Sequence, residues 1–321
     1  MNAQGVVAKD SQENLALALG SGQLSDALTK QGQAILDRLK DPLRLSILGA
    51  PGSGKSTLMN LLLGTNVIPE GVRLPTLSLT YGEQPTAKCV LPNGEKKVLA
   101  GADPYAIASL KPAFVELALP LPSLRKLSMM EVVTGEDMND QARAINWASK
   151  RTDIALWSTV TCDILDERLW ASLPDKIQEH SFLVLTKADA LGAAGRLGTL
   201  KENADIMGAP YFRKVLPLAT KVALSARKPD GTVDKSIMRS SGGVALISAI
   251  LQEVETGKRA AADAADNFLR QIDFDPEEAA AKQAEKLMAA KPKTEVKTVI
   301  LDEAQAEEAR ALAEKMLKKV E

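Results

Sequence analysis

A glycine-rich octapeptide has residue types and spacing suited to holding phosphate. It follows the G-x-x-x-x-G-K-S pattern of a P-loop and reads Gly49-Ala50-Pro51-Gly52-Ser53-Gly54-Lys55-Ser56. Glycines let the backbone wrap closely around an anion, and the amides of the loop and of a following helix present positive partial charge to it. Lys55 is expected to reach the β- and γ-phosphates, and the Ser56 hydroxyl to bind Mg²⁺. The alternative interpretation is a glycine-rich turn with a chance lysine.

The segments that flank the octapeptide supply the context that a P-loop requires. Residues 43–48 predict a strand and residues 57–63 predict a helix. This order of strand, loop and helix favours phosphate binding over a simple turn. The residues expected to contact the nucleotide here are Gly49, Gly52, Ser53, Gly54, Lys55, Ser56 and Thr57.

A second motif indicates which base the nucleotide carries. Thr186-Lys187-Ala188-Asp189 directly follows the apolar strand predicted at residues 182–185 and resembles the N/T-K-x-D element of GTPases. A carboxylate at Asp189 can accept hydrogen bonds from both N1–H and the exocyclic amine of guanine, whereas adenine would leave it unpaired. The aliphatic stem of Lys187 would lie along the base. The alternative for these residues is a polar turn.

A third motif is expected on the other side of the base. Ser225-Ala226-Arg227 follows the last strand region, predicted at residues 215–224, and resembles the S-A-K element whose backbone N–H receives guanine O6. Motifs at strand ends meet at one edge of an open α/β sheet, where such sheets bind ligands. The sequence therefore predicts GTP or GDP with Mg²⁺ as the ligands; an ATP-dependent kinase-type enzyme is the reading that Asp189 disfavours.

Two residues of the loop after the P-loop helix are candidates for the phosphate side of the site. Thr76 is the candidate switch threonine, whose hydroxyl or carbonyl would meet Mg²⁺ while the γ-phosphate is present. Its alternative is an ordinary threonine at the start of a strand. Arg73 could act as an arginine finger in cis, although a solvated loop arginine is the simpler interpretation.

Composition limits the other classes of function. The chain has 321 residues, enough for one large α/β domain and a smaller element, and 45% of them are hydrophobic. Aromatic residues are only 3% and the net charge is −1, so neither base stacking nor a global basic field points to nucleic acid. Cys89 and Cys162 are too few for a disulfide framework, and His180 is the only histidine, which nearly excludes histidine-dependent catalysis.

The sequence shows neither a secretory leader nor a membrane span. The N-terminus lacks a basic region followed by an apolar one, and no uninterrupted apolar run approaches about 18 residues. We therefore expect a cytoplasmic protein, with peripheral membrane association through its C-terminal helices as an open alternative.

Strand patterns alternate with helical ones through the middle of the chain. This predicts a three-layer α/β domain with a mainly parallel sheet. A helix is expected from Ser25 or Gly22 to about Lys40, and residues 1–20 are expected to fray or to form a short helix. Beyond about residue 255, Ala, Glu, Lys and Gln dominate, and helices are expected at 244–272, 276–290 and 301–320. An apolar stripe on the last of these predicts packing on the rest of the chain or, alternatively, on a partner helix or a lipid surface.

On these motifs the chain resembles the dynamin-like branch of P-loop GTPases, in the translation-factor-like class. The resemblance covers roughly residues 22–255 and rests on residues 43–64, 67–76, 115–122, 153–159 and 186–189. It implies a GTPase domain, placed at 41–255, that is able to dimerise across the nucleotide. It also implies a small helical bundle from both termini, here the segments 1–40 and 256–321. Too few residues remain for the long stalk of membrane-remodelling dynamins.

The chain departs from the family pattern at groups that assist hydrolysis. No D-x-x-G element follows the strand expected at 127–133; Glu131 is predicted to replace its aspartate at the metal, with an extra residue before Gly135. Pro51 and Gly52 stand where dynamins carry glutamine and serine, so groups that position the attacking water or a potassium ion are missing. Two hypotheses follow: a GTP-hydrolysing switch or assembly protein, and a GTP-binding scaffold with weak or no hydrolysis that recruits a partner through its helical tail.

Overall fold

The structure is a computed structural model that describes residues 3–228, 230–275 and 281. The chain divides into two compact units, residues 1–273 and residues 274–321. The helices expected at 276–290 and 301–320, with their apolar stripe, lie outside the described residues apart from position 281. Every helix and strand whose bounds are described belongs to the first unit.

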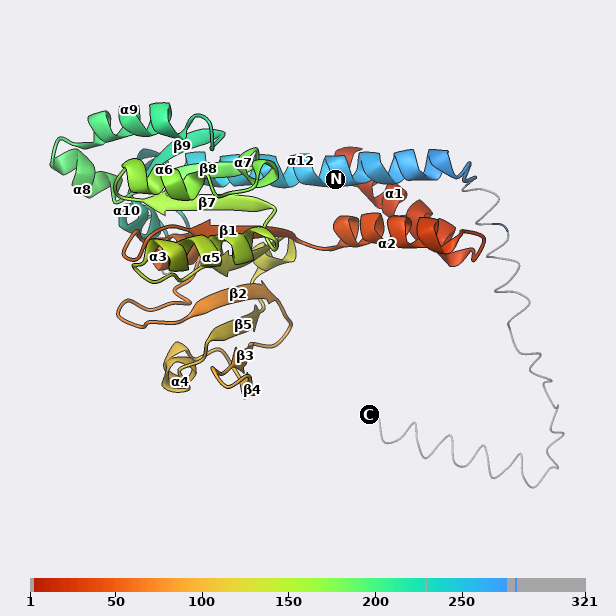
Figure 1. Cartoon of the computed structure of the whole chain (residues 1–321), viewed down its shortest axis with the longest axis horizontal. Coiled ribbons are helices and arrows are strands. Elements are labelled where there is room, and N and C mark those ends of the chain that lie inside the picture. Colours follow the sequence, from red (N-terminus) through yellow and green to blue (C-terminus); the bar gives the residue numbers. More distant parts are fainter. Residues whose placement is uncertain (1–2, 229, 276–280, 282–321) are drawn as a thin grey trace, which may run out of the picture. The chain divides into compact units, whose positions relative to one another are not determined.

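One nine-stranded sheet forms the centre of this unit (Figure 1), in the order β4-β3-β5-β2-β6-β1-β7-β8-β9. The strands are β1 Leu43–Leu48, β2 Thr76–Tyr81, β3 Thr86–Val90, β4 Lys96–Ala100, β5 Phe114–Leu119, β6 Leu127–Glu131, β7 Ile154–Thr159, β8 Ser181–Thr186 and β9 Lys214–Leu218. Neighbouring strands are parallel except at β2–β6, β3–β4 and β3–β5. The mainly parallel sheet predicted from the sequence is confirmed.

Helices cover both faces of the sheet, which gives the predicted three layers. The helices are α1 Ala3–Gly20, α2 Asp26–Lys40, α3 Lys55–Leu63, α4 Pro104–Ser109, η1 Pro122–Arg125, α5 Met138–Ser149, α6 Ile164–Trp170, α7 Asp175–Gln178, α8 Ala188–Ala193, α9 Leu197–Gly208, α10 Thr220–Ser225, α11 Lys235–Ser240 and α12 Gly243–Gln271. One hydrophobic core joins the sheet to α3, α4, α10, α11 and α12, and a second joins it to α5, α6, α7 and α9. Strands β7 and β8 are buried along their whole lengths, as expected for parallel strands covered on both faces.

The second core reaches only part of the sheet. Its buried strand residues come from β6, β1, β7, β8 and β9, so helices leave the same face of β2, β5, β3 and β4 uncovered. The strand side chains on that face alternate with the buried ones, and Thr80, Lys88 and Glu116 on it are exposed. The antiparallel pairs β2–β6, β3–β4 and β3–β5 lie in this half of the sheet, and antiparallel sheets tolerate one solvent-exposed face.

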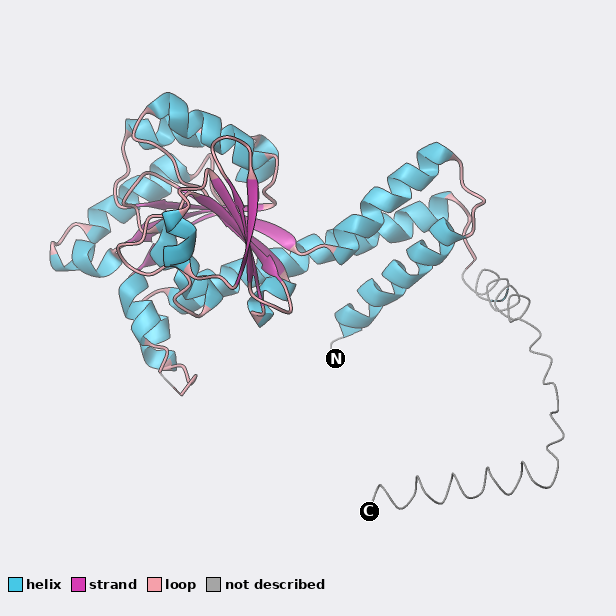
Figure 2. Ribbon diagram, turned by 90° about the horizontal axis from the view of Figure 1, so that it is seen from below, coloured by secondary structure: helices cyan, strands magenta, loops and turns pink. Residues whose placement is uncertain are grey.

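Helices from both ends of the first unit form the small bundle that was expected. Helices α1, α2 and the C-terminal part of α12 lie side by side (Figure 2). Leu15, Leu36 and Phe268 are buried in it, and a Cβ at Gly32 would lie 3.0 Å from the Phe268 ring. Helix α12 runs without a break across residue 255, where the sequence placed a segment boundary.

Two local expectations were wrong. Residues 3–20 form an 18-residue helix rather than a frayed or short one, because Leu15 and Ala18 are buried by the neighbouring helices. The last strand ends at Leu218 instead of continuing to residue 224, and helix α10 begins at Thr220. Helix α2 begins as expected after Ser25, whose hydroxyl accepts a hydrogen bond from the Leu28 amide at 3.4 Å.

Candidate nucleotide-binding site

The glycine-rich loop connects the C-terminal end of β1 to the first turn of α3. Gly49 has φ 131°, and a Cβ there would lie 2.1 Å from the carbonyl oxygen of Ser158 on β7. Only glycine allows the loop to leave the sheet so close to the neighbouring strand. Ser53, which is 2% exposed, fixes the middle of the loop through a hydrogen bond of 2.8 Å between its hydroxyl and that of Ser158.

Lys55 lies inside the loop and not in solvent. Its Nζ donates to the carbonyl oxygens of Gly49 at 2.8 Å and Ala50 at 2.9 Å, and the residue is 6% exposed. Burial lowers the pKa of Lys55, and the charge of Glu131 acts against that shift. The ammonium group is thus held among carbonyl oxygens of the glycine-rich loop.

Ser56 and Glu131 meet beside the loop. The Ser56 hydroxyl donates a hydrogen bond of 2.6 Å to Glu131 Oε1, and Glu131 is 4% exposed at the end of β6. Burial raises the pKa of Glu131, while the Ser56 hydrogen bond and the Lys55 charge act in the opposite direction. Within the described part of the chain, Glu131 Oε2 is buried without a hydrogen-bond partner.

These oxygens fit a magnesium ion. Mg²⁺ prefers one or two protein carboxylates plus hydroxyl, water and phosphate oxygens. A buried carboxylate oxygen without a partner is costly unless a ligand satisfies it. The Ser56 hydroxyl and the Glu131 carboxylate would therefore hold the ion. No group of three or more His, Cys, Asp and Glu side chains that could hold a metal by themselves occurs among the residues that the structure describes.

Thr76 is tied to the segment that follows β6. Its Oγ1 accepts a hydrogen bond from the Val133 amide at 3.0 Å and lies 3.4 Å from the Val133 carbonyl oxygen. Thr76 begins β2, and its neighbour Leu77 pairs with Glu131 in the β2–β6 register. Thr76 therefore lies beside the Ser56–Glu131 pair, whereas Arg73 is exposed in the loop before it.

The Thr186–Asp189 motif contacts the P-loop directly. Thr186, at the end of β8 and fully buried, donates from Oγ1 to the Ser53 carbonyl oxygen at 2.5 Å. Lys187 adopts a left-handed conformation with φ 54°, and its Nζ donates to the Gly52 carbonyl oxygen at 3.1 Å. Asp189 is exposed in the first turn of α8. The structure thus brings this motif to the edge of the sheet that holds the P-loop.

The third motif is not at a strand end. Ser225 is the last residue of α10, where its hydroxyl donates to the Val222 carbonyl oxygen at 2.8 Å, and Ala226 is buried. The Arg227 guanidinium lies against Gly64, at the C-terminal end of α3. Lys55 begins this helix of nine residues, so the Arg227 guanidinium is about 13 Å from Lys55 along the helix axis.

Two residues that the sequence analysis missed occupy the end of β9. Ala219 and Thr220 follow directly on Leu218, and α10 starts at Thr220 and packs on α3. Thr220 is 4% exposed, and its Oγ1 has no partner among the described residues. The short strand pattern Lys214–Leu218 followed by two small residues was the available signal, but the apolar residues Val222, Ala223 and Leu224 obscured it.

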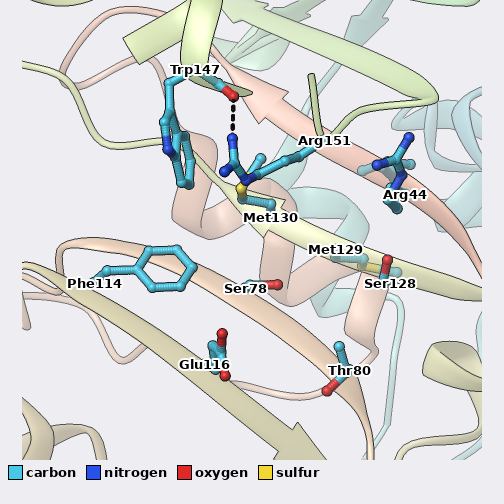
Figure 3. Close-up of a pocket in the computed structure, with 11 residues that line it drawn as sticks. Arg44, Ser78, Thr80, Phe114, Glu116, Ser128, Met129, Met130, Trp147 and Arg151 are labelled. Atoms are coloured by element: carbon cyan, nitrogen blue, oxygen red, sulfur yellow. Dashed lines mark hydrogen bonds between the residues drawn. The ribbon is translucent and has the colours of Figure 1, made fainter. Parts of the chain in front are cut away.

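A groove of about 470 Å³ lies elsewhere, on the uncovered face of the sheet (Figure 3). Its walls include Phe114 and Trp147, whose rings meet edge to face, and Arg151, which stacks on Trp147. Arg44, at the start of β1, also lines the groove. The P-loop, in contrast, follows the opposite end of the same strand. The groove is therefore separate from the nucleotide site.

None of the described helices is long and apolar enough to cross a membrane.

Comparison with known proteins identifies the fold. No protein-family model matches the chain, and a search of curated proteins finds no match. A solved structure described as an oligomerised bacterial dynamin pair that provides a mechanism for the long-range sensing and tethering of membranes aligns with a TM-score of 0.61 and 17% identity, over 90% of this chain and 59% of that one. A second structure with that description aligns with a TM-score of 0.53 and 16% identity, over 79% of this chain and 42% of the other. The chain thus spans about three fifths of the length of the first structure, and in fold it is similar to bacterial dynamins, with the α/β architecture of P-loop GTPases.

Proposed function

We propose that this chain binds GTP and GDP together with Mg²⁺ and hydrolyses GTP to GDP and phosphate, as a dynamin-like switch or assembly protein. The contact between Thr186 Oγ1 and the Ser53 carbonyl oxygen, at 2.5 Å, carries the proposal. It joins a loop suited to phosphate to a motif whose carboxylate, Asp189, is suited to guanine. The dynamin-like fold supports the same reading.

The residues divide the work between phosphate, metal and base. Lys55 and the loop amides bind the phosphates and stabilise the charge that develops on them. Ser56, Thr76 and Glu131 supply oxygens for Mg²⁺, which neutralises phosphate charge when bound. Asp189 accepts hydrogen bonds from the N1–H and the exocyclic amine of guanine. Backbone amides at the start of α10, rather than those near Ser225, donate to the guanine carbonyl oxygen. Thr76 must release Val133 before its hydroxyl can reach the metal.

A GTP-binding scaffold with weak or no hydrolysis is the second candidate. The observation in its favour is the segment after Glu131, which has no D-x-x-G element and is bonded to Thr76 through Val133. A positioned water is what such an element normally provides, and phosphoryl transfer depends on that positioning. In this case the segment 256–321 would recruit a protein or a membrane surface.

Nucleotide titration tests the site itself. We expect fluorescent GDP and GTP analogues to bind the full chain and unlabelled ATP to compete poorly. The Lys55→Ala variant should lose phosphate-dependent affinity, and Asp189→Ala should lose the preference for guanine over adenine. The exposed Asp205→Ala on α9 serves as the matched control. Equal competition by ATP, or unchanged affinity in Lys55→Ala, would refute the proposed site.

Phosphate release separates the two candidates. It should be measured with and without K⁺ and at rising protein concentration, because a site completed by a second copy becomes more active as copies meet. Turnover that rises with concentration supports a homodimer across the nucleotide. No turnover under any of these conditions, with intact GTP binding, would leave the scaffold as the function.

A further inference from the structure

Asn60 is a buried polar residue on α3 that the proposed chemistry does not use. It is 5% exposed, and its amide makes three hydrogen bonds to the loop between α3 and β2, residues 64–75. Its Nδ2 donates to Asn66 Oδ1 at 2.8 Å and to the Ile68 carbonyl oxygen at 2.7 Å. Its Oδ1 accepts from the Ile68 amide at 3.0 Å.

These bonds divide the loop into a fixed part and an exposed part. Both backbone polar groups of Ile68 are bonded to one side chain, and the Ile68 side chain is itself buried in the core. Leu74 is also buried, close to the start of β2. Between them, Glu70, Gly71 and Arg73 are exposed. The loop is thus held at Ile68 and at Leu74, and the Glu70 carboxylate between them is paired with Lys221 Nζ at 2.9 Å.

The same helix face serves the metal and the loop. Ser56 and Asn60 are four residues apart on α3, so their side chains lie on one face. Ser56 bonds to Glu131, and Asn60 bonds to the loop that leads into Thr76. Ile68 and Thr76 are eight residues apart in sequence with the buried Leu74 between them, so Asn60 holds the chain shortly before it enters β2.

We propose that Asn60 is a positioning residue, which anchors residues 64–68 so that Thr76 is presented to the γ-phosphate side of the site, and thereby sets the preference for GTP over GDP. This inference rests on the proposed function. Asn60 touches neither nucleotide nor metal; it acts through Ile68 and Thr76. If its role were only to satisfy buried backbone groups, its removal would weaken binding of both nucleotides alike.

The test uses graded variants of the full chain. Asn60→Leu removes all three hydrogen bonds, and Asn60→Asp keeps the acceptor for the Ile68 amide while losing both donors. Asn66→Ala removes one bond at an exposed position. Asn146→Asp, an exposed substitution of the same chemistry on α5, is the control. Circular dichroism verifies that each variant is folded.

Two measurements decide the outcome. Amide hydrogen exchange at Ile68 should accelerate by about tenfold or more in Asn60→Leu and by less in Asn60→Asp. The ratio of GDP to GTP-analogue dissociation constants should fall by about tenfold in Asn60→Leu, and Asn60→Asp should restore part of it. Unchanged exchange at Ile68 refutes the anchor, and faster exchange with an unchanged ratio refutes the effect on nucleotide preference.

Failure of the proposed function has a different signature. If the unsubstituted chain binds neither nucleotide, the GTP site is refuted, and with it the effect of Asn60 on preference. Exchange at Ile68 in the absence of nucleotide still decides whether Asn60 holds the loop. If Asn60→Leu fails to fold, the comparison of Asn60→Asp with Asn146→Asp gives the same decision.

Discussion

Ser56 Oγ donates a hydrogen bond of 2.6 Å to Glu131 Oε1, across a separation of 75 residues in sequence. The contact joins the first turn of α3 to the end of β6. Glu131 pairs with Ile47 in the β1–β6 register, so the strand that leads into the P-loop also places the carboxylate. The Glu131 carboxylate therefore reaches the Ser56 hydroxyl, which the sequence predicts to bind Mg²⁺.

Replacing Glu131 with glutamine tests the metal site. Glu131→Gln keeps the size of the side chain and an acceptor for Ser56 but removes the charge that attracts a cation. We expect Mg²⁺ affinity, measured as the Mg²⁺ dependence of nucleotide binding or by Mn²⁺ electron paramagnetic resonance, to fall by about 10- to 100-fold. Glu116→Gln, on the uncovered face of the sheet, should leave it unchanged. Equal metal affinity in the chain with and without Glu131→Gln would show that Glu131 does not bind the metal.

The metal-free stability should depend on pH through the same carboxyl. Burial raises the pKa of Glu131 above its usual 4.5, so the folded state binds this proton more tightly than the unfolded state. The free energy of unfolding should therefore fall as pH rises from 4.5 through the folded-state pKa. Glu131→Gln lacks this loss, so its free energy of unfolding should rise relative to that of the unsubstituted chain over that pH range. Urea unfolding at a series of pH values in the presence of a chelator measures this difference. If the unfolding free energies of the two chains changed with pH in the same way, the prediction would be contradicted.

Thr186 should couple base recognition to the phosphate loop. Thr186→Val keeps the shape of the side chain but leaves the Ser53 carbonyl oxygen without its hydrogen bond. Because the site is buried, we expect a loss of about 1–3 kcal/mol in unfolding free energy and about tenfold weaker nucleotide binding. Thr232→Val, whose hydroxyl bonds only to nearby Asp230 among the described residues, is the control for denaturation and titration. A Thr186→Val chain that binds as tightly as the control would show that this bond is dispensable.

Two glycines of the P-loop should respond differently to alanine. At Gly49 the new Cβ would lie 2.1 Å from the Ser158 carbonyl oxygen, so the loop must move away from β7, at about 3 kcal/mol or more. At Gly52, with φ 76°, no atom lies within 4 Å of the new Cβ, and only the backbone strain of about 1–2 kcal/mol remains. Thermal denaturation and nucleotide titration of both variants test the order; Gly52→Ala as damaging as Gly49→Ala would contradict the geometry.

The two side-chain contacts of Glu253 predict an asymmetry between its partners. Glu253 on α12 is 4% exposed and meets Arg213 Nη1 at 2.7 Å and His180 Nδ1 at 2.8 Å. The side chains of Arg213 and His180 are 46% and 36% exposed, so water can hydrate them if Glu253 is lost. Arg213→Ala, which leaves a buried carboxylate with one partner, should cost about 2 kcal/mol, and Glu253→Gln only about 1 kcal/mol. Urea unfolding at neutral pH measures both, and the reverse order would contradict the burial argument.

Residues close together in sequence were predicted well. The P-loop needs only a strand, a glycine-rich turn and a helix within about twenty residues, and local propensity and periodicity specify each of them. The Thr186–Asp189 motif lies at the end of an apolar strand for the same reason, and the structure places it against the P-loop. The mainly parallel sheet followed from the alternation of strand and helix patterns.

The third motif shows where local pattern is ambiguous. Val222, Ala223 and Leu224 form an apolar run that suits a strand or a buried helix equally, and helix α10 forms because it packs on α3. The strand therefore ends earlier, and Ala219 and Thr220 replace Ser225 and Ala226 at the edge of the sheet.

What the sequence by itself determined is the strand, glycine-rich loop and helix of residues 43–63, the position of Thr186–Asp189 after a strand, and the class of fold, because each follows from local pattern along the chain. The tertiary structure alone decided which side chains meet beside the glycine-rich loop. Glu131 reaches Ser56 only because β6 pairs with β1, and Thr76 reaches Val133 only because β2 pairs antiparallel with β6. Strand pairing is non-local, so no pattern along the chain contains it.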